Sequence, residues 1–279
     1  MGFTLTDDNY YSSEANKRFI SVSQYKDFAG TLGHTGCEYE ALQKINDTAF
    51  PQSKKALILG SYVDRYFEGT QEQYIEENRS SIFQKPKSKT AKPEKYKDFI
   101  DADYAIARAE KDPYFMKYMA GDKQTILTAE VAGAEWKIKM DSYLENKAIV
   151  DLKYMKSVRE LEWSPIVRKK LDFIRYYGYD IQGAIYQEVV FQNTGKRLPF
   201  YIAAITKETP NDIAIIQVTQ NYLDDAMSRV KENIDRIIAI KRGDIEPVMC
   251  GECATCRRDK VLSAPIGIDD LMKREENFK

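Results

Sequence analysis

Apolar residues along the 279-residue chain recur with two different periods. Spacings of three and four residues predict helices over residues 21–45, 53–67, 171–191 and 222–240, and a further helical segment between residue 97 and about Met119. Ser21 or Ser23 is the expected N-cap of the first helix, because a serine oxygen can accept the unpaired backbone N–H groups there. The first half of the chain is therefore expected to be mainly helical.

The centre of the chain changes to short, partly alternating apolar segments, which predict strands. Residues 126–131, 136–143 and 148–153 are expected to form three antiparallel strands, and residues 198–206 and 213–218 two more. This order predicts an α/β fold, with a mixed central sheet flanked by helices. We expect one domain over residues 1–279, made of a helical N-terminal wrap (20–120), a core (121–220) and a C-terminal helix with a cysteine-bearing tail (221–279).

Composition excludes several classes of protein. Hydrophobic residues make up 43% of the chain and charged residues 30%, which is enough for a sizeable core. No run of eighteen apolar residues occurs, so no membrane span is expected. The polar, acidic N-terminus lacks the pattern of a secretory signal, so we expect a cytoplasmic protein. The net charge is −1, so any contact with nucleic acid must come from a local basic patch.

The main candidate chemistry lies on two adjacent predicted strands. Asp151 and Lys153 are two residues apart on one strand, so their side chains share a face, and a hairpin could bring Asp141 beside Asp151. Paired carboxylates repel unless a cation lies between them, and Mg²⁺ or Mn²⁺ favours such oxygen ligands. Lys153 could position a water and stabilise charge on a phosphate. An isolated Asp-x-Lys is more often an ordinary polar strand face, so the neighbouring motifs decide.

These residues resemble the PD-(D/E)xK nuclease superfamily, in which an Asp ends one strand and (Asp/Glu)-x-Lys lies on the next. Two further motifs are similar to its RecB-like branch. Gly60 is followed four residues later by Asp64, where the branch often has His, and Gln182 is followed four residues later by Tyr186. The start of the domain, around Ser21 and Cys37, is also similar. The resemblance is strongest to a phage- and prophage-encoded domain related to the exonuclease VIII nuclease.

The resemblance implies a restriction-endonuclease-like core and a Mg²⁺-dependent DNA exonuclease that processes linear duplex ends for phage-type recombination. It implies metal ligation by Asp64, Asp141, Asp151 and the Leu152 carbonyl, with Lys153, Gln182 and Tyr186 completing the catalytic site. The implied setting is a bacterial host cell, with a single-strand annealing protein as partner and a homo-oligomer as a possible assembly. The alternatives are an endonuclease of the same fold and a non-catalytic DNA-binding recombination scaffold.

The four cysteines predict a second metal centre. Cys250, Cys253 and Cys256 are separated by two-residue gaps, and Cys37 is the remaining thiol that could complete four ligands. Resemblance to RecB-like nucleases implies a [4Fe–4S] cluster, although the last gap is shorter here than is usual. Zinc is the alternative, followed by free buried thiols. His34 is the only histidine, and a lone histidine is more often a loop residue than a ligand.

Basic residues gather in two places. Six lysines follow one another between residues 85 and 97: Lys85, Lys87, Lys89, Lys92, Lys95 and Lys97. A solvated loop and a phosphate-binding loop are equally good interpretations of that stretch. Lys169 and Lys170 follow Trp163, which could stack on an unpaired base, although core packing is the favoured interpretation for it. Glu130 is expected at the surface, and Glu68 could support the metal site or be a solvated helix residue.

Overall fold

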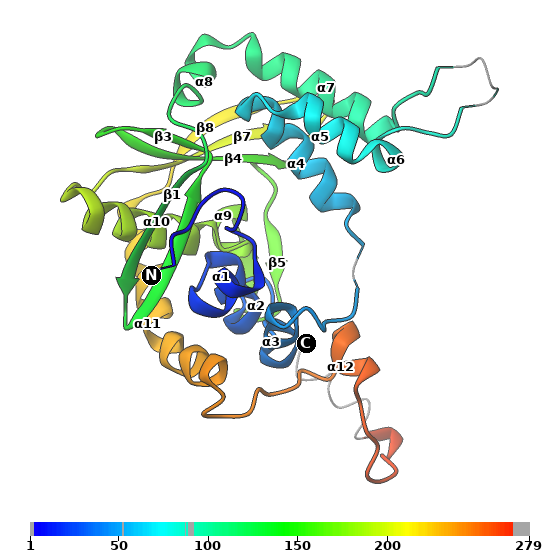
Figure 1. The fold of residues 1–279 in the computed structure, drawn as a ribbon, viewed down its shortest axis with the longest axis vertical. Coiled ribbons are helices and arrows are strands. Elements are labelled where there is room, and N and C mark those ends of the chain that lie inside the picture. Colours follow the sequence, from blue (N-terminus) through cyan, green and yellow to red (C-terminus); the bar gives the residue numbers. More distant parts are fainter. Residues whose placement is uncertain (1–2, 52, 87, 89–91, 270–279) are drawn as a thin grey trace.

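The computed structural model describes residues 3–51, 53–86, 88 and 92–269, and a four-stranded mixed sheet lies at its centre (Figure 1). In the spatial order of the sheet, the strands are β3 (Ser142–Leu144), β4 (Ala148–Met155), β7 (Phe200–Thr206) and β8 (Ile213–Gln217). The central pair β4–β7 is parallel and the two outer pairs are antiparallel. The mixed sheet flanked by helices that the sequence predicts is therefore confirmed.

A separate antiparallel hairpin, β1 (Thr125–Val131) with β2 (Ala134–Met140), precedes the central sheet. The single strand expected over residues 136–143 is divided at Asp141, because β2 pairs with β1 whereas β3 pairs with β4. Asp141 therefore lies where the chain passes from one sheet to the other. The antiparallel pairing expected at both turns is confirmed.

One face of the central sheet is covered by helices from the first half of the chain. Val150 and Leu152 of β4 pack there in a core with α4 (Lys55–Glu68), α7 (Lys97–Glu110) and α8 (Pro113–Tyr118). The helix expected over residues 53–67 is thus confirmed as α4. The segment expected to reach Met119 forms two helices, because Asp112 caps a new helix that begins with Pro113.

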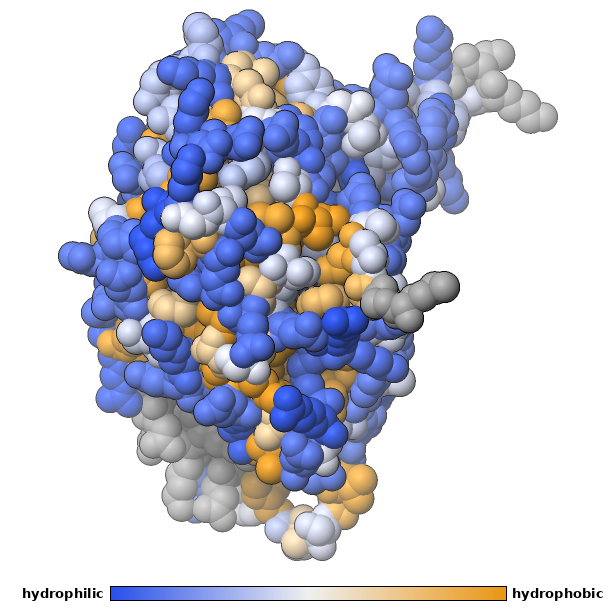
Figure 2. Space-filling model, turned by 60° about the vertical axis from the view of Figure 1, so that its left-hand side comes forward, coloured by the Kyte–Doolittle hydropathy of each residue, from blue (hydrophilic) through white to orange (hydrophobic). Residues whose placement is uncertain are grey.

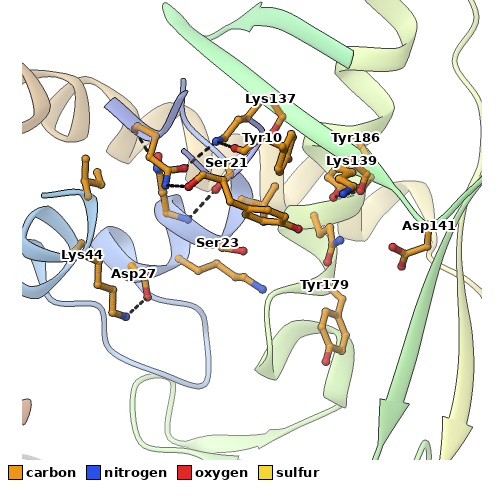
Figure 3. A pocket seen from close by; sticks show the side chains of 18 of the residues that line it. Tyr10, Ser21, Ser23, Asp27, Lys44, Lys137, Lys139, Asp141, Tyr179 and Tyr186 are labelled. Atoms are coloured by element: carbon orange, nitrogen blue, oxygen red, sulfur yellow. Dashed lines mark hydrogen bonds and ion pairs between the residues drawn. The ribbon is translucent and has the colours of Figure 1, made fainter. Parts of the chain in front are cut away.

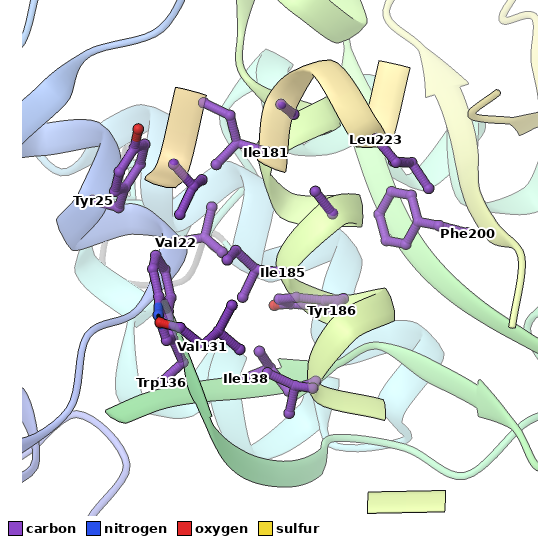
Figure 4. Close-up of a cluster of buried hydrophobic side chains, with 14 of the residues drawn as sticks. Val22, Tyr25, Val131, Trp136, Ile138, Ile181, Ile185, Tyr186, Phe200 and Leu223 are labelled. Carbon is purple, nitrogen blue, oxygen red and sulfur yellow. Dashed lines mark hydrogen bonds between the residues drawn. The ribbon is translucent and has the colours of Figure 1, made fainter. Parts of the chain in front are cut away.

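The opposite face of the sheet meets a larger core, which includes α10 (Tyr179–Thr194) and α11 (Gln220–Arg242) (Figure 4). Side chains alternate along a strand, so Asp151 and Lys153 project from the same face as buried Ile149. Two polar residues therefore replace apolar ones on a strand that faces α10. The long helix expected over residues 222–240 is confirmed as α11.

The N-terminal helices lie on the same side of the sheet as α11, beside the β1–β2 hairpin in Figure 1. They are α1 (Ser13–Arg18), α2 (Val22–Ala29) and α3 (Glu38–Ile45). The expectation of one helix over residues 21–45 is wrong, because the chain turns at Gly30 with a φ of 78°. A Cβ atom at Gly30 would lie 2.4 Å from the His34 carbonyl oxygen, so only glycine fits this turn. The loop ends at Cys37, the N-cap of α3.

The helix expected over residues 171–191 is also divided. Gly178, with a φ of 69°, separates α9 (Phe173–Tyr176) from α10. The elements that the sequence did not predict are short: α1, α5 (Gln71–Glu77), α6 (Arg79–Ile82), β5 (Glu162–Ser164), β6 (Lys169–Leu171) and α12 (Ala254–Arg258). Helices of four to seven residues make at most about two turns, and strands of three residues scarcely alternate, so neither period can be recognised in them.

Within the described residues, no helix is both long and apolar enough to cross a membrane. The face drawn in Figure 2 is mainly hydrophilic, with apolar side chains scattered among charged ones.

Candidate active site and cysteine cluster

Asp151 and Lys153 form an ion pair on β4, beneath the face of α10. Lys153 Nζ lies 2.5 Å from Asp151 Oδ2, and Gln182 Nε2 donates a hydrogen bond of 2.6 Å to Asp151 Oδ1. Asp151 is only 2% exposed. Its Oδ2 has no hydrogen-bond partner among the described residues, since the Lys153 contact is an ion pair without hydrogen-bond geometry. A buried carboxylate oxygen is thus left with unused acceptor capacity.

Two more carboxylates, Asp64 on α4 and Asp141 between β2 and β3, lie in the same electrostatic environment. Asp141 Oδ2 accepts a hydrogen bond of 2.8 Å from the Leu152 N–H. Burial raises the pKa of Asp141 well above its usual range, and the charges of Asp151 and Asp64 add to the rise. Burial also raises the pKa of Asp64 to about 7, against the opposing charge of Lys153. The three carboxylates that the sequence singled out therefore lie near enough to influence one another's pKa values.

Lys153 supplies the positive charge of this site. Burial lowers the pKa of its ammonium group, but the carboxylates of Asp151 and Asp141 outweigh burial, so the pKa lies above its ordinary value. Mutually repelling carboxylates with an unused oxygen are the donor set that a hard divalent cation favours. Of all the side chains described, only the four cysteines already gather around one point at ligand spacing, so the carboxylates are more widely spaced than the thiolates.

Gln182 and Tyr186 share the face of α10 that turns towards the strands. Gln182 holds Asp151, and the Tyr186 hydroxyl donates a hydrogen bond of 3.0 Å to the Lys139 carbonyl. Burial, with the nearby charges of Asp151 and Asp141, raises the pKa of Tyr186 above its ordinary value, so the phenol stays protonated. These contacts favour positioning roles for both residues over proton transfer.

A cavity of about 500 Å³ opens beside these residues, with the N-terminal helices on its other side (Figure 3). Besides Lys153, four lysines line it: Lys26, Lys44, Lys137 and Lys139. Burial lowers the pKa of Lys26 to about 8, and the neighbouring charge of Lys153 contributes. Burial also lowers the pKa of Lys137 to about 8. A concave wall that crowds several ammonium groups suits a polyanionic ligand.

The lysines of this wall are functional candidates that the sequence reasoning missed. Lys137 and Lys139 alternate along β2 and lead to Asp141, which is a signal that the sequence contains. Lys137 Nζ contacts Asn16 Oδ1 at 2.8 Å, and Lys139 Nζ pairs with an N-terminal aspartate. Lys26 has no comparable local signal, because tertiary folding packs α2 against α10 and so brings Lys26 near Lys153.

The lysines between residues 85 and 97 differ in exposure and in their contacts. Lys85 and Lys92 are exposed and do not line the cavity beside Asp151, whereas Lys87 and Lys89 lie outside the described residues. Lys95 is not a solvated loop residue. Its Nζ lies 2.6 Å from Tyr62 Oη and 2.6 Å from the Asp103 carboxylate, so Lys95 ties the loop to α4 and α7. Lys97 pairs with Asp101 in the first turn of α7.

Three other candidate residues lie away from the Asp151–Lys153 pair or beside it: Trp163, Glu130 and Glu68. Trp163 is 56% exposed, so the expectation that it packs in the core is wrong; the short β5–β6 hairpin presents it to solvent. Glu130 is exposed on β1, as expected. Glu68 pairs with Arg65 at 2.8 Å, and its charge contributes to the raised pKa of Asp64.

The four cysteines form a second site, and none is in a disulfide. Cys37 Sγ lies 3.5 Å from Cys256 Sγ and 3.8 Å from Cys253 Sγ, and Cys250 Sγ lies 3.9 Å from Cys256 Sγ. All four sulfurs are within 4.8 Å of one another. Backbone N–H groups of Glu40, Cys253 and Cys256 point at the sulfurs, which favours thiolates. The prediction that Cys37 joins the other three is confirmed.

The chain is similar to a known family and to a solved structure. The family model described as "PDDEXK-like domain of unknown function" matches residues 21–259. A crystal structure described as a "putative exonuclease" from Eubacterium rectale is 51% identical, with a TM-score of 0.91, over 97% of this chain and 98% of that chain. No curated protein matches the chain. The chain belongs to the family of PDDEXK-like domains of unknown function and has the fold of the PD-(D/E)xK superfamily.

Proposed function

We propose that this chain is a divalent-metal-dependent DNA nuclease that hydrolyses phosphodiester bonds at the ends of linear duplexes. The observation that carries the proposal is the buried pair of Asp151 and Lys153, which Gln182 holds in place beside a lysine-lined cavity. Buried acceptors of a structural site normally accept hydrogen bonds, whereas Asp151 Oδ2 is paired with Lys153 and accepts no hydrogen bond from the described groups. Membership of a PDDEXK-like family agrees with this interpretation.

Each residue of the proposed site has its own role in binding the metal or the phosphate. Asp64, Asp141 and Asp151, with the Leu152 carbonyl, would hold Mg²⁺ or Mn²⁺, which when bound polarises a phosphate and makes water more acidic. The Lys153 ammonium stabilises the negative charge that develops on a phosphate oxygen and positions the attacking water. Gln182 orients Asp151, and Tyr186 fastens α10 to β2 through the Lys139 carbonyl. The lysines of the cavity wall neutralise phosphates without reading the base sequence.

The choice of an exonuclease rests on two similarities. The sequence resembles the exonuclease VIII nuclease, and the related crystal structure is described as a "putative exonuclease". By the same resemblance, the biological role is end processing in phage-type recombination, with a single-strand annealing protein as partner. Lys85, Lys87, Lys89 and Lys92 remain proposed contacts to the DNA backbone outside the cavity.

The decisive experiment compares end-labelled linear duplex DNA with covalently closed circles, with and without Mg²⁺. We expect Mg²⁺-dependent loss of the linear duplex and survival of the circle. Asp151→Asn should abolish cleavage with the fold retained, because it removes a metal-ligating charge, and Glu130→Gln is the matched exposed control. Lys153→Met should lower the rate about 100- to 1,000-fold. Cleavage of the circle would support the endonuclease alternative. Binding without cleavage of either DNA would support the scaffold alternative.

For the cysteine site, we propose one tetrahedral zinc ion. Metal–sulfur bonds of about 2.3 Å place tetrahedral ligands about 3.8 Å apart, which agrees with the observed sulfur spacings. The [4Fe–4S] cluster implied by the resemblance binds each thiolate to a different iron, and so holds the sulfurs further apart. Elemental analysis after anaerobic purification should find one zinc in a colourless protein. A brown protein absorbing near about 400 nm would overturn zinc in favour of the cluster.

A further inference from the structure

The segment that precedes α1 contacts the lysines of β2. We call residues 3–11 the N-terminal segment. The carboxylate of Asp7 forms an ion pair with Lys139 Nζ, and the ring centres of Tyr10 and Tyr11 lie 5.6 and 5.4 Å from the same nitrogen. Lys139, Tyr10 and Tyr11 all line the cavity of the active site, and Figure 3 shows Lys139 and Tyr10 on its wall. The N-terminal segment therefore encloses one ammonium group of that cavity between two rings and a carboxylate.

The N-terminal segment is attached near its two ends. At one end, Tyr10 is only 5% exposed, and its carbonyl oxygen accepts a hydrogen bond from the ammonium group of a β2 lysine. At the other end, the ring centre of Phe3 lies 6.1 Å from that of Phe19. Asp7 lies between these attachments, and its side chain is 62% exposed. The Asp7 carboxylate can therefore turn from Lys139 into solvent while both attachments stay in place.

The charge of the N-terminal segment opposes the proposed substrate. Asp7 and Asp8 are both exposed, and residues 3–11 contain no lysine or arginine. The charge of Asp141 acts on the Tyr11 hydroxyl, so the segment also lies near the carboxylates of the site. A carboxylate on a cavity lysine repels a polyanion and occupies the positive charge that would bind it. Carboxylate and phosphate oxygens both accept charge-assisted hydrogen bonds from an ammonium group, so one can replace the other.

We propose that Asp7 occupies Lys139 in the free protein, and that a phosphate of the DNA backbone takes its place when the substrate binds. The inference rests on the proposed function and adds a regulatory contact within the same cavity. An ion pair with an exposed partner contributes little free energy, whereas a neutralised DNA phosphate also releases condensed counterions. The exchange is therefore favourable at low salt, and Asp7 reduces the affinity for DNA by the strength of the ion pair that must be broken.

The first test measures the affinity of the full-length protein for a labelled blunt duplex without divalent metal. The Asp151→Asn background is used, because it should bind the duplex without consuming it. Asp7→Ala should tighten binding about two- to fivefold, which is the strength of an exposed ion pair expressed as a ratio of affinities. Asp8→Ala is the matched control, because it removes the same charge from an exposed neighbour. It should change the affinity by less than about twofold.

The salt dependence of binding tests whether Lys139 contacts a phosphate. Each phosphate contact contributes about 0.9 to the slope of log affinity against log salt concentration for duplex DNA. In the Asp151→Asn background, Lys139→Met should therefore reduce the size of that slope by about 0.9. If Asp7 keeps Lys139 in the complex, the slope does not change, and the proposal is overturned.

A double-mutant cycle separates the ion pair from the general effect of removing a negative charge. Asp7→Ala should tighten binding only while Lys139 is present, so it should have no effect in the Lys139→Met background. An equal gain in both backgrounds would overturn the exchange. A gain in Asp8→Ala as large as that in Asp7→Ala would also overturn it.

Failure of this inference and failure of the proposed function give different results. A wild-type chain that cuts DNA, together with unchanged affinity in Asp7→Ala, would overturn the inference alone. A chain that neither cuts nor binds duplex DNA would overturn the proposed function and this inference with it.

Discussion

Gln182 on α10 donates a hydrogen bond of 2.6 Å from Nε2 to Oδ1 of Asp151 on β4. This bond leaves Oδ2 of the same carboxylate without a hydrogen-bond donor among the described groups. One oxygen of Asp151 is therefore held by Gln182, and the other is paired with Lys153. The arrangement is that of a ligand whose orientation is set by a supporting residue.

Loss of the hydrogen bond from Gln182 to Asp151 should reduce the affinity of the site for Mg²⁺ more than it reduces the stability of the fold. Gln182→Met keeps the length of the side chain but removes the donor, and should lower the rate about 10- to 100-fold with a higher Mg²⁺ requirement. The rate is measured across a Mg²⁺ titration. Gln192→Met, an exposed change on the same helix, is the control. An unchanged Mg²⁺ requirement in Gln182→Met would remove Gln182 from the site.

Asp141→Asn should change activity and stability in opposite directions. The raised pKa of Asp141 means that the folded state disfavours the ionised carboxylate, so stability is lost as pH rises above the ordinary carboxyl range. Asparagine removes this repulsion and can still accept the Leu152 hydrogen bond. Without Mg²⁺ at neutral pH, the variant should therefore melt higher, by about 2–4 °C for each kcal/mol recovered, while cleavage is lost.

The measurement is thermal unfolding with and without Mg²⁺. Added Mg²⁺ should stabilise the wild-type protein and have little effect on Asp141→Asn, because a cation offsets the same repulsion. A variant that melts lower than the wild type without metal would show that Asp141 is stabilised by its surroundings and not strained by them.

The cysteine site should act as a staple between distant parts of the chain. Cys37 caps α3 and Cys256 lies in α12, 219 residues further on. Cys37→Ser should remove the bound ion and lower the melting temperature by several degrees, since the ion closes a long loop. Elemental analysis and thermal unfolding check both effects. His34→Ala, which lines the same cavity, should keep the ion. Retention of a full equivalent of metal in Cys37→Ser would contradict the four-thiolate site.

Local spacing explains what the sequence could predict of the site. Asp151 and Lys153 are two residues apart on a strand, and Gln182 and Tyr186 four apart on a helix, so each pair shares a face whatever the tertiary fold. The cysteines followed from their number and their gaps. Three strands of the mixed sheet, β4, β7 and β8, were recognisable as apolar segments of five to eight residues, whereas β3 has three residues and was expected only as the end of a longer strand.

Contacts between distant segments explain what the sequence could not predict. Lys26 lies near Lys153 because α2 packs against α10, which is about 150 residues away in the sequence. The sequence suggested a loop position for Lys95 because its partner, Asp103, lies eight residues further on. Pro86 and Pro93, which precede Lys95, also suggested a flexible segment. We expected Trp163 in the core because tryptophans are usually well buried. Its hairpin, however, has strands of three residues and no inner face large enough to bury an indole ring.

Because of Lys241, the free energy of unfolding should increase as the pH rises above neutral. Its Nζ, at the end of α11, donates hydrogen bonds to the carbonyls of Asn16 at 2.9 Å and Phe19 at 2.8 Å. Burial, helped by the charge of Lys137, lowers the pKa of Lys241 from 10.5 to about 7. Between those two values the unfolded chain binds a proton that the folded chain does not, so the free energy of unfolding increases with pH in that window.

Lys241→Met removes the titrating group and keeps an unbranched side chain in the same space. The difference in free energy of unfolding between wild type and Lys241→Met should therefore shift in favour of the wild type as pH rises from about 7 to about 9. Titrating groups that do not interact with Lys241 contribute equally to both proteins and cancel in this difference, so what remains comes from Lys241 and its neighbour Lys137. Urea unfolding at the two pH values measures it, with Lys231→Met, an exposed change on the same helix, as control. A difference that is the same at both pH values would mean that Lys241 stays charged in the folded protein, held by the carbonyl oxygens of Asn16 and Phe19.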